Sequence, residues 1–419
     1  MKKIGMILFG ALAIVMAGCS KNAEPEQPSV PLENAWMFDE TLPVPIQFGM
    51  STGVGLQSTK TMVNTWDDLG AYRLGIFALN LDGKDGLTKG SYDVYLDNEP
   101  ADCVFDEERG KDMIKFDENK YYPYASDRNL SFFGYYPYFG NAPEYTADNI
   151  RIPIPAEEWG RHDVLCASAF ADTMFVKKDA ELGYFVPVAR DLATHFYNGY
   201  NATYMRFLNR NGIYEEKMPN LVFKHKTTCF VFDAYLTNVP TDKVTDFDQV
   251  PVIQSIEISG ESIYEKAYLE IAKKDIEDRT EWSGSLTVAG ANNGSLKLGG
   301  KNAGDLNSVP GQIADEPLKY NLPDNQFFLQ PMDASEKLTI KITLMNPYNK
   351  KREVFEAEFP AIPEEVKRFE EGKYYPFTIT INYFTGVEIS ASLDPWKNGW
   401  EGLDTENDKI GEDAPTGAL

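Results

Sequence analysis

The stretch KLTIKITL, residues 337–344, alternates apolar and polar side chains with a period of two. Leu338, Ile340, Ile342 and Leu344 share one face of an extended chain, while lysines and threonines share the other. This alternation predicts a β-strand with one face on a core and one face in water. The same pattern recurs in PFTITINYF and in VEISASL near the end of the chain.

Further strand candidates are distributed along the whole sequence. They are residues 45–50, 72–80, 130–136, 150–154, 164–170, 221–236, 252–258, 285–288, 325–330 and 353–359. Turn-forming stretches such as LDGKDG, NRNG and ANNG separate them. Amphipathic helix patterns are nearly absent, so we predict an all-β protein that is mainly antiparallel and built as sandwiches.

A polar stretch with glycine and proline, FLNRNGIYEEKMPN at residues 207–220, divides the strand candidates into two groups. Each group has about the number of strands that one β-sandwich needs. We therefore predict an N-terminal sandwich over residues 41–217 and a C-terminal sandwich over 218–403. The acidic residues 404–419 are predicted to be a disordered tail.

The start of the chain combines two lysines with an apolar run over residues 4–17, too short to span a bilayer and typical of a signal peptide. The sequence Met16-Ala17-Gly18-Cys19 resembles a bacterial lipobox, in which the cysteine becomes a lipidated N-terminus. The alternative is an ordinary secretory signal with a chance cysteine. We predict a signal peptide over 1–18, lipidation of Cys19 and a proline-rich flexible tether over 19–40.

The formal net charge of −24 argues against nucleic acid as a partner and against electrostatic docking on anionic lipid. If Cys19 carries lipid, Cys103, Cys166 and Cys229 remain. An odd number without short spacings predicts neither a disulfide framework nor a zinc site. The apolar neighbours of Cys166 and Cys229 indicate small buried side chains.

No enzyme motif is present, and the three histidines, His162, His195 and His225, lie far apart in the sequence. We predict no catalytic residues, no metal and no cofactor. His225 alternates onto an apolar strand face, which favours a packed, hydrogen-bonded histidine. The aromatic block YYPYASDRNLSFFGYYPYF, residues 121–139, has two interpretations, packing within the sheet or a sugar-stacking platform, and we favour packing.

Six stretches occur in an order that resembles the fimbrillin (minor-fimbrium-like) family of surface lipoproteins of Bacteroides-type bacteria. They are PIQFGM with TKT (45–61), YRLGIFAL (72–79), LSFFGYYPY (130–138), HDVLCAS (162–168), LVFKHKTTCFVFDAYL (221–236), and FEEGKYYPFTITI with DPWKNG (369–399). The resemblance covers nearly the whole chain. Cys166, Cys229 and the tail after Trp400 depart from it.

The resemblance implies two transthyretin-like β-sandwiches in tandem, in a lipoprotein anchored in the outer membrane at the cell surface. Family members are stalk, tip or anchor subunits of fimbriae. In stalk subunits a protease cuts after an arginine or lysine, the first strand leaves, and a strand from another subunit replaces it. Here the removable strand would place Ile46, Phe48 and Met50 inward. Lys60 and Arg73 are the candidate cut sites, or surface charges on an uncut tip or anchor protein.

Two further assignments concern a modification site and the donor strand. Asp172-Thr173-Met174 resembles an O-glycan acceptor, which makes Thr173 a candidate modification site. The tail from residue 401 lacks alternating apolar residues, so residues 387–396 are the better donor candidate, or the protein donates no strand.

The predicted function is a structural subunit of a fimbrium assembled by strand exchange and contributing to adhesion. Its predicted partners are other pilus subunits, the outer membrane through the lipid, and host or bacterial surface ligands. The alternative is a surface glycan-binding lipoprotein.

Overall fold

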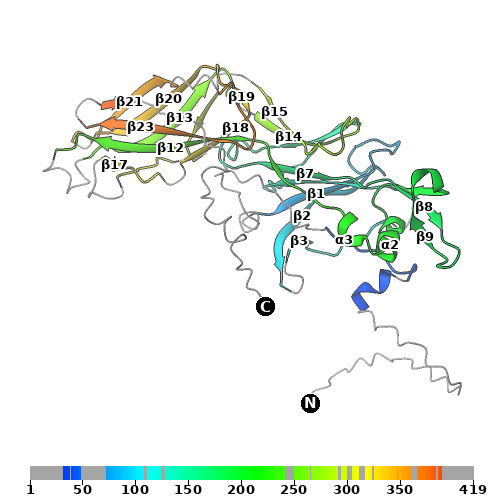
Figure 1. Cartoon of the computed structure of the whole chain (residues 1–419). Coiled ribbons are helices and arrows are strands. Elements are labelled where there is room, and N and C mark those ends of the chain that lie inside the picture. The colour runs from blue at the N-terminus through cyan, green and yellow to red at the C-terminus, as the bar shows by residue number, and fades with distance from the viewer. Residues whose placement is uncertain are drawn as a thin grey trace, which may run out of the picture.

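The structure is a computed structural model of the 419-residue chain. It describes residues 32–37, 39–48, 72–107, 111–123, 128–240, 250–264, 266–290, 294–299, 304–310, 317–322, 325–346, 348–359, 366–383 and 386–388. The molecule is elongated, with the N-terminal elements at one end and the strands of the C-terminal half at the other (Figure 1).

A six-stranded sheet with the order β11-β7-β4-β1-β2-β3 organises the N-terminal half, and every neighbouring pair in it is antiparallel. Its strands are β1 (Leu74–Leu79), β2 (Val94–Asp106), β3 (Lys111–Phe116), β4 (Ser131–Tyr136), β7 (Leu165–Ala169) and β11 (Lys224–His225). The central strands β1 and β4 are buried on both faces. This explains why LGIFAL and SFFGYY are nearly continuous apolar runs, because a strand covered on both sides has no solvent face.

Helices and the start of the described chain cover one face of this sheet. The cover comprises η1 (Leu32–Met37), residues 39–48, α2 (Ala202–Arg210) and α3 (Tyr214–Lys217). Asn201 caps α2, since its side chain accepts a hydrogen bond from the Tyr204 amide at 2.9 Å. We call this layer the helical cover.

The helical cover includes two stretches for which the sequence did not predict a helix. Residues 207–220, where the boundary after residue 217 is predicted, contain the end of α2 and all of α3, and Phe207, Leu208 and Tyr214 are buried in the core of the N-terminal half. The expected tether over 19–40 ends earlier, because Trp36 in η1 is buried in the same core. Hydrophobic burial overrides the polar composition of both stretches.

A second sheet, with the order β15-β14-β6-β5, covers the opposite face of the six-stranded sheet. Its strands are β5 (Glu144–Tyr145), β6 (Asn149–Pro153), β14 (Lys266–Lys273) and β15 (Ser285–Ala289). We call it the strand cover. β6 precedes the expected boundary after residue 217 and β14 follows it, yet the two strands pair antiparallel with Ile152 opposite Leu269. The two halves of the chain therefore share a sheet.

Two larger sheets pack together in the C-terminal half. One has the order β17-β12-β23-β24, and β18 also pairs with β12. Its strands are β12 (Thr228–Thr237), β17 (Leu318–Lys319), β18 (Gln326–Leu329), β23 (Tyr374–Asn382) and β24 (Gly386–Glu388). The other, β16-β13-β20-β21, contains β13 (Val252–Gly260), β16 (Gly294–Lys297), β20 (Leu338–Met345) and β21 (Arg352–Glu358). β12 and β23 pair in parallel over nine residues, a departure from the antiparallel expectation.

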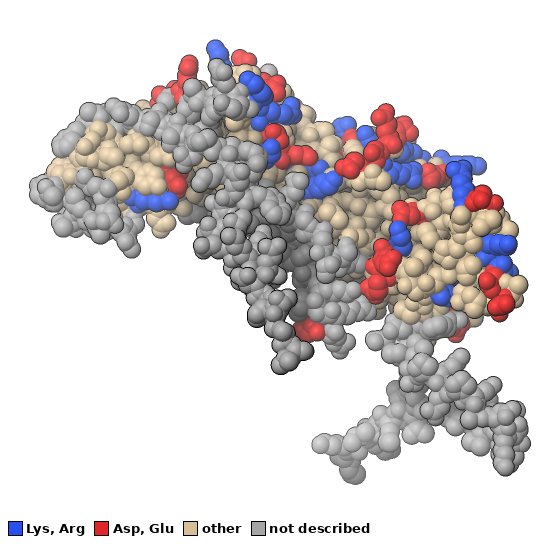
Figure 2. Space-filling view, in the orientation of Figure 1, with Lys and Arg blue, Asp and Glu red and all other residues tan. Residues whose placement is uncertain are grey.

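Two small sheets complete the described fold. They are β10-β8-β9, made of β8 (Met174–Lys178), β9 (Phe185–Pro187) and β10 (His195–Tyr197), and the pair β19 (Met332–Asp333) with β22 (Arg368–Phe369). The short helix η2 (Arg190–Leu192) lies between β9 and β10. In Figure 1, β8 and β9 form the far end of the molecule beyond α2. Acidic and basic side chains are intermixed on the face seen in Figure 2.

The all-β, mainly antiparallel prediction is confirmed, and most strand candidates are strands. KLTIKITL forms β20, whose inward residues are Leu338, Ile340, Ile342 and Leu344 as the alternation predicts. β2, β3, β8 and β14 were not among the candidates. The candidate at 45–50 differs: its described residues 45–48 form one isolated bridge, not a strand. The division into two transthyretin-like domains stays a prediction.

Candidate functional site

Residues 39–48, which we call the N-terminal segment, insert apolar side chains into the core beneath the helical cover. Val44, Ile46 and Phe48 are buried, with Ile46 6% and Phe48 2% exposed. The Phe48 ring meets Phe132 edge-on, with ring centroids 5.2 Å apart. The inward positions alternate, as the sequence predicted for a removable strand; Met50, its third member, lies outside the described residues.

Among the described residues, the main chain of the segment makes two backbone–backbone hydrogen bonds to the residues that follow β3. The Ile46 amide donates to the Lys120 carbonyl and the Tyr122 amide donates to the Val44 carbonyl, each at 2.8 Å. Pro45 forms a bridge to Tyr121 at the same place. By comparison, β1 and β4 pair over five residues. Apolar burial rather than a hydrogen-bonded ladder thus holds the segment.

A groove of about 510 Å³ lies between the segment and β3, the last strand in the order of the six-stranded sheet. We call it the edge groove; it is lined by Pro45, Ile46, Gln47, Val104, Met113, Ile114, Lys115, Phe116, Asn119 and Lys120. The outer strand of a sheet presents main-chain donors and acceptors that another strand can use. Here that edge lies next to buried apolar side chains, including Ile114 and Phe116.

Arg206 on α2 holds the preceding part of the segment by its main chain. Its Nε donates to the Trp36 carbonyl at 3.3 Å, and its Nη2 donates to the carbonyls of Glu40 at 3.3 Å and Leu42 at 2.5 Å. Arg206 is only 8% exposed. A buried guanidinium needs acceptors, and main-chain carbonyls supply them here.

Arg210 lies one turn further along α2 and binds the Glu40 side chain of the same segment. Its Nη2 is 2.8 Å from Glu40 Oε1. The hydrogen bond from Arg210 lowers the pKa of the Glu40 carboxyl below its ordinary value. We call Arg206 and Arg210 together the arginine clamp.

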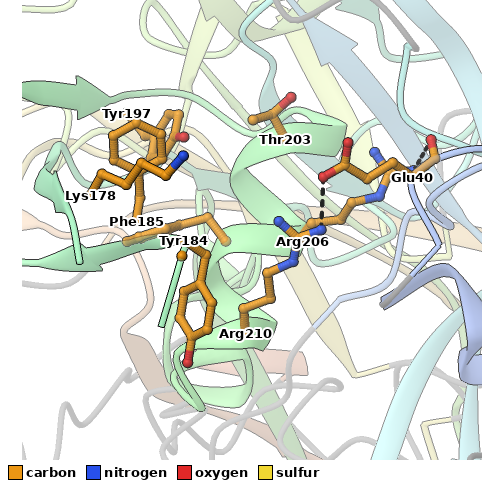
Figure 3. A pocket seen from close by; sticks show the side chains of 10 residues that line it. Glu40, Lys178, Tyr184, Phe185, Tyr197, Thr203, Arg206 and Arg210 are labelled. Atoms are coloured by element: carbon orange, nitrogen blue, oxygen red, sulfur yellow. Dashed lines mark hydrogen bonds and ion pairs between the residues drawn. The ribbon is translucent and has the colours of Figure 1, made fainter. Parts of the chain in front are cut away.

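The arginine clamp borders a pocket of about 380 Å³ (Figure 3). Its lining comes from α2, from the segment and from the small sheet: Glu40, Lys178, Gly183, Tyr184, Phe185, Tyr197, Thr203, Arg206, Phe207 and Arg210. Figure 3 shows Glu40 directed at the arginines and Tyr184, Phe185 and Tyr197 on the other side. The N-terminal segment therefore runs from this pocket to the edge groove.

Arg73, a candidate cut site, precedes β1 and is tied to the sheet. Its guanidinium contacts Asp102 at 2.8 Å and Asp117 at 2.7 Å, and its carbonyl accepts from the Tyr138 amide at 2.8 Å. The hydrogen bond to Asp117 raises the Arg73 pKa. A protease that needs an extended chain would have to break these contacts. The other candidate, Lys60, and the lipidation candidate, Cys19, lie outside the described residues.

Thr173 is exposed immediately before β8, so an enzyme could reach its hydroxyl. The neighbouring Asp172 binds Lys217 at 2.7 Å, and its carbonyl accepts from the Tyr204 hydroxyl at 3.0 Å. Of the donor candidate 387–396, residues 387 and 388 belong to β24, which pairs with β23; the rest lies outside the described residues.

His225 is packed and hydrogen-bonded, as predicted. Its Nδ1 lies 2.7 Å from the Asp163 carboxylate, which also accepts from the Thr227 hydroxyl at 2.9 Å, and all three residues are buried. His162 contacts Glu158 at 2.6 Å, whereas His195 is exposed on β10. The histidines do not converge. Within the part of the chain that the structure describes, no group of three or more His, Cys, Asp or Glu residues could hold a metal ion.

Two other sequence interpretations are confirmed. Cys166 and Cys229 are buried, and burial raises the pKa of both thiols, that of Cys166 to about 12. In the aromatic block, Phe132, Phe133 and Tyr135 are buried in the sheet, which supports packing over a sugar platform. Among the described helices, none is both long enough and apolar enough to cross a membrane.

Sequence reasoning missed the arginine clamp. Arg206 and Arg210 are four residues apart, which places them on one side of a helix, but the helix itself was not predicted. The N-cap Asn201 and the Gly212 that follows the helix were available signals for it. The pairing with Glu40 spans 170 residues, and no local pattern indicates it.

No family model matches the chain, and no curated protein matches it. Among solved structures, it is similar to a candidate cell adhesion protein from Bacteroides uniformis, with 16% identity, a TM-score of 0.40 and coverage of 85% of this chain and 98% of that one. It is similar to the fimbrial anchor protein Mfa2 from Porphyromonas gingivalis, with 8% identity, a TM-score of 0.32 and coverage of 85% and 98%.

A third similar structure is a fimbrial protein from Bacteroides ovatus, with 11% identity, a TM-score of 0.23 and coverage of 74% of this chain and 45% of that one. Two of these three structures are thus fimbrial proteins, and one is a candidate cell adhesion protein. Their identity to this chain is low throughout.

Proposed function

We propose that this protein is a structural subunit of a cell-surface fimbrium that is assembled by strand exchange and contributes to adhesion. The observation that carries the proposal is the N-terminal segment: it fills the core with alternating apolar side chains, and within the described residues two backbone–backbone hydrogen bonds attach it near the sheet edge. The six ordered stretches that resemble fimbrillins support the same function.

The physical basis is the vacancy that the segment would leave. Removal of Val44, Ile46 and Phe48 would expose an apolar trough beside β3, the outermost strand of the six-stranded sheet among the described residues. A strand from another subunit would satisfy both needs, since its side chains refill the trough while its main chain pairs with the edge. Its register would be enforced, because a slip of one residue turns the wrong side chains inward.

Within this proposal, a cut at Lys60 is favoured over a cut at Arg73, which two carboxylates hold in place. Both Cys19 and the N-terminal segment precede Lys60 in the chain. A cut there would therefore separate the folded body from a lipid on Cys19. An uncut chain would keep a lipid on Cys19, as a subunit that anchors the fimbrium in the outer membrane requires. The tandem transthyretin-like architecture and the absence of enzymatic activity belong to the same proposal.

Binding of surface glycans is the second candidate function. The pocket in Figure 3 brings three aromatic rings, of Tyr184, Phe185 and Tyr197, close to cationic side chains. Aromatic faces can stack on sugar rings. This function would need no strand exchange, and it would persist in a protein that never enters a fimbrium.

The test is electron microscopy of cells with and without the gene, combined with N-terminal sequencing of the protein from purified fimbriae. We expect loss or altered length of fimbriae, and a mature N-terminus either after Lys60, for a stalk subunit, or at Cys19, for an anchor or tip. Unchanged fimbriae that do not contain the protein would contradict the proposal. Glycan binding by such cells would then favour the second candidate.

A further inference from the structure

The arginine clamp binds the N-terminal segment in two chemically different ways. Arg206 contacts three main-chain carbonyls within seven residues, and Arg210 contacts one carboxylate. The first contact requires main-chain carbonyls presented by the end of η1 and by the turn that follows it, and the second requires an acidic side chain. Together, the two contacts let the site distinguish one incoming strand from another by its main-chain shape and its charge, which apolar packing alone cannot do.

We propose that the arginine clamp selects the strand that replaces the N-terminal segment, and that this strand must carry an acidic residue before its apolar residues. The inference rests on the proposed strand exchange and names the chemistry of the partner. In the segment, Glu40 precedes Val44, Ile46 and Phe48 by four, six and eight residues. The incoming strand of another subunit, seated in the same direction, would keep this spacing.

The charges around the pocket explain why a neutral strand is a poor replacement. Glu40 is the only acidic residue in the described lining, and it belongs to the segment that leaves. Lys178, Arg206 and Arg210 would stay behind on the folded body. Departure of the segment would thus remove the one carboxylate from a pocket with three cations, and a strand with an acidic residue would restore it.

Because Arg206 is buried, its need for main-chain carbonyls is stricter than the need of Arg210 for a carboxylate. With residues 36–42 in place, Arg206 is 8% exposed and its guanidinium donates to three carbonyls; a replacement strand that covers Arg206 without supplying acceptors would leave buried donors without partners. Arg210 is more accessible, and the Glu40 side chain is 72% exposed. We therefore expect a modest contribution from the carboxylate and a larger one from the carbonyl contacts.

The test uses the full chain in detergent, with the recognition sequence of a specific protease introduced around Lys60 so that the segment can be separated by cutting. A fluorescent peptide of residues 35–48 is added in excess, and its incorporation is followed by anisotropy and size-exclusion chromatography. The peptide variants are Glu40→Gln and Ile46→Asp. The protein variants are Arg210→Gln and Lys178→Gln. The second is a control, because it removes a cation of the same pocket and leaves the ion pair between Arg210 and Glu40 in place.

We expect the parent peptide to enter the cut chain and not the uncut chain. Glu40→Gln should weaken its binding by about twofold to fivefold, the range of exposed ion pairs. Arg210→Gln in the protein should remove this difference between the two peptides, whereas Lys178→Gln should leave most of it. Salt at about 1 M should reduce the difference as well. The Arg206→Met variant should lose affinity at least about tenfold if it folds.

Two results would overturn the proposal, and they are distinguishable. If the parent and Glu40→Gln peptides bind equally while Ile46→Asp does not bind, the clamp does not select and strand exchange still stands. If no peptide enters the cut chain, even after the segment has been released in urea and refolding confirmed, strand exchange fails together with the clamp. The Glu40 and Arg210 variants alter exposed side chains, so the test does not depend on the buried Arg206.

Discussion

Both faces of the six-stranded sheet bury apolar side chains, but the two faces are covered in different ways. On one face, the strand cover pairs β6 with β14 over five residues, and side chains add further links between the halves, such as Lys274 to the Gly83 carbonyl at 2.9 Å. On the other face, the described residues hold the N-terminal segment through two backbone–backbone hydrogen bonds, the contacts of the arginine clamp, and a hydrogen bond from the Tyr214 hydroxyl to the Gln47 side chain at 3.2 Å.

Because of this difference, the two covers suit different roles: one can hold the two halves together, and the other can be replaced. Apolar burial is non-directional, so any strand with suitable side chains can supply it. A hydrogen-bonded ladder fixes partner and register at every residue. The strand cover is therefore suited to join the halves permanently, and the segment of the helical cover is suited to be replaced.

The largest effect is expected on the side of the strand cover. Trp159 follows β6, is buried in the core shared by both halves and donates from Nε1 to the Tyr264 carbonyl at 3.1 Å. Trp159→Ala should lower the free energy of unfolding by about 3–5 kcal/mol, because it leaves a large cavity. Urea denaturation measures this, with Trp159→Phe as a milder control. An effect below that of Trp159→Phe would contradict the shared core.

A smaller loss is expected at the buried polar cluster that joins β7 and β11. Asp163→Asn would remove the charge that accepts from His225 and Thr227, at a cost of about 2 kcal/mol. Thr227→Val removes one of these bonds and should cost about half as much. Thermal unfolding of both variants checks the order. If Asp163→Asn is neutral, the cluster does not connect the halves.

Local opening should distinguish the two covers without any mutation. The Ile46 amide should exchange with solvent at least about a hundredfold faster than the ladder amides of β6 and β14, because the segment can open without global unfolding. Hydrogen exchange with mass spectrometry measures both regions in one sample. Equal protection would mean that the segment opens only when the whole protein unfolds.

The smallest effect concerns pH and the arginine clamp. Arg210 lowers the pKa of Glu40 in the folded protein, so the ion pair stabilises the segment above the ordinary value of 4.5 and this contribution is lost as the pH falls through the folded-state pKa. Protection of the Ile46 amide, corrected for intrinsic exchange, should decrease a few-fold between pH 6 and pH 3.5. The Arg210→Gln variant should show a flatter profile; an identical profile would exclude the ion pair as the cause.

Local patterns predicted more of the fold than of the site. Alternation placed β20 and its inward residues correctly, and apolar context placed Cys166 and His225 in the interior. β14 carries the same alternation in Ala267, Leu269 and Ile271 and could have been found. The helical structure within residues 207–220 was missed because a polar surface composition does not reveal that the opposite side of a helix is buried.

By itself, the sequence determined that strands such as β12, β13 and β20 form and which of their faces are apolar, because side-chain alternation is a property of neighbouring residues. Only the tertiary structure decided that β6 pairs with β14, that β12 runs parallel to β23, and that Glu40 meets Arg210. These contacts join residues more than a hundred positions apart. Such pairings depend on how chain segments meet when the core closes, and no local periodicity encodes that.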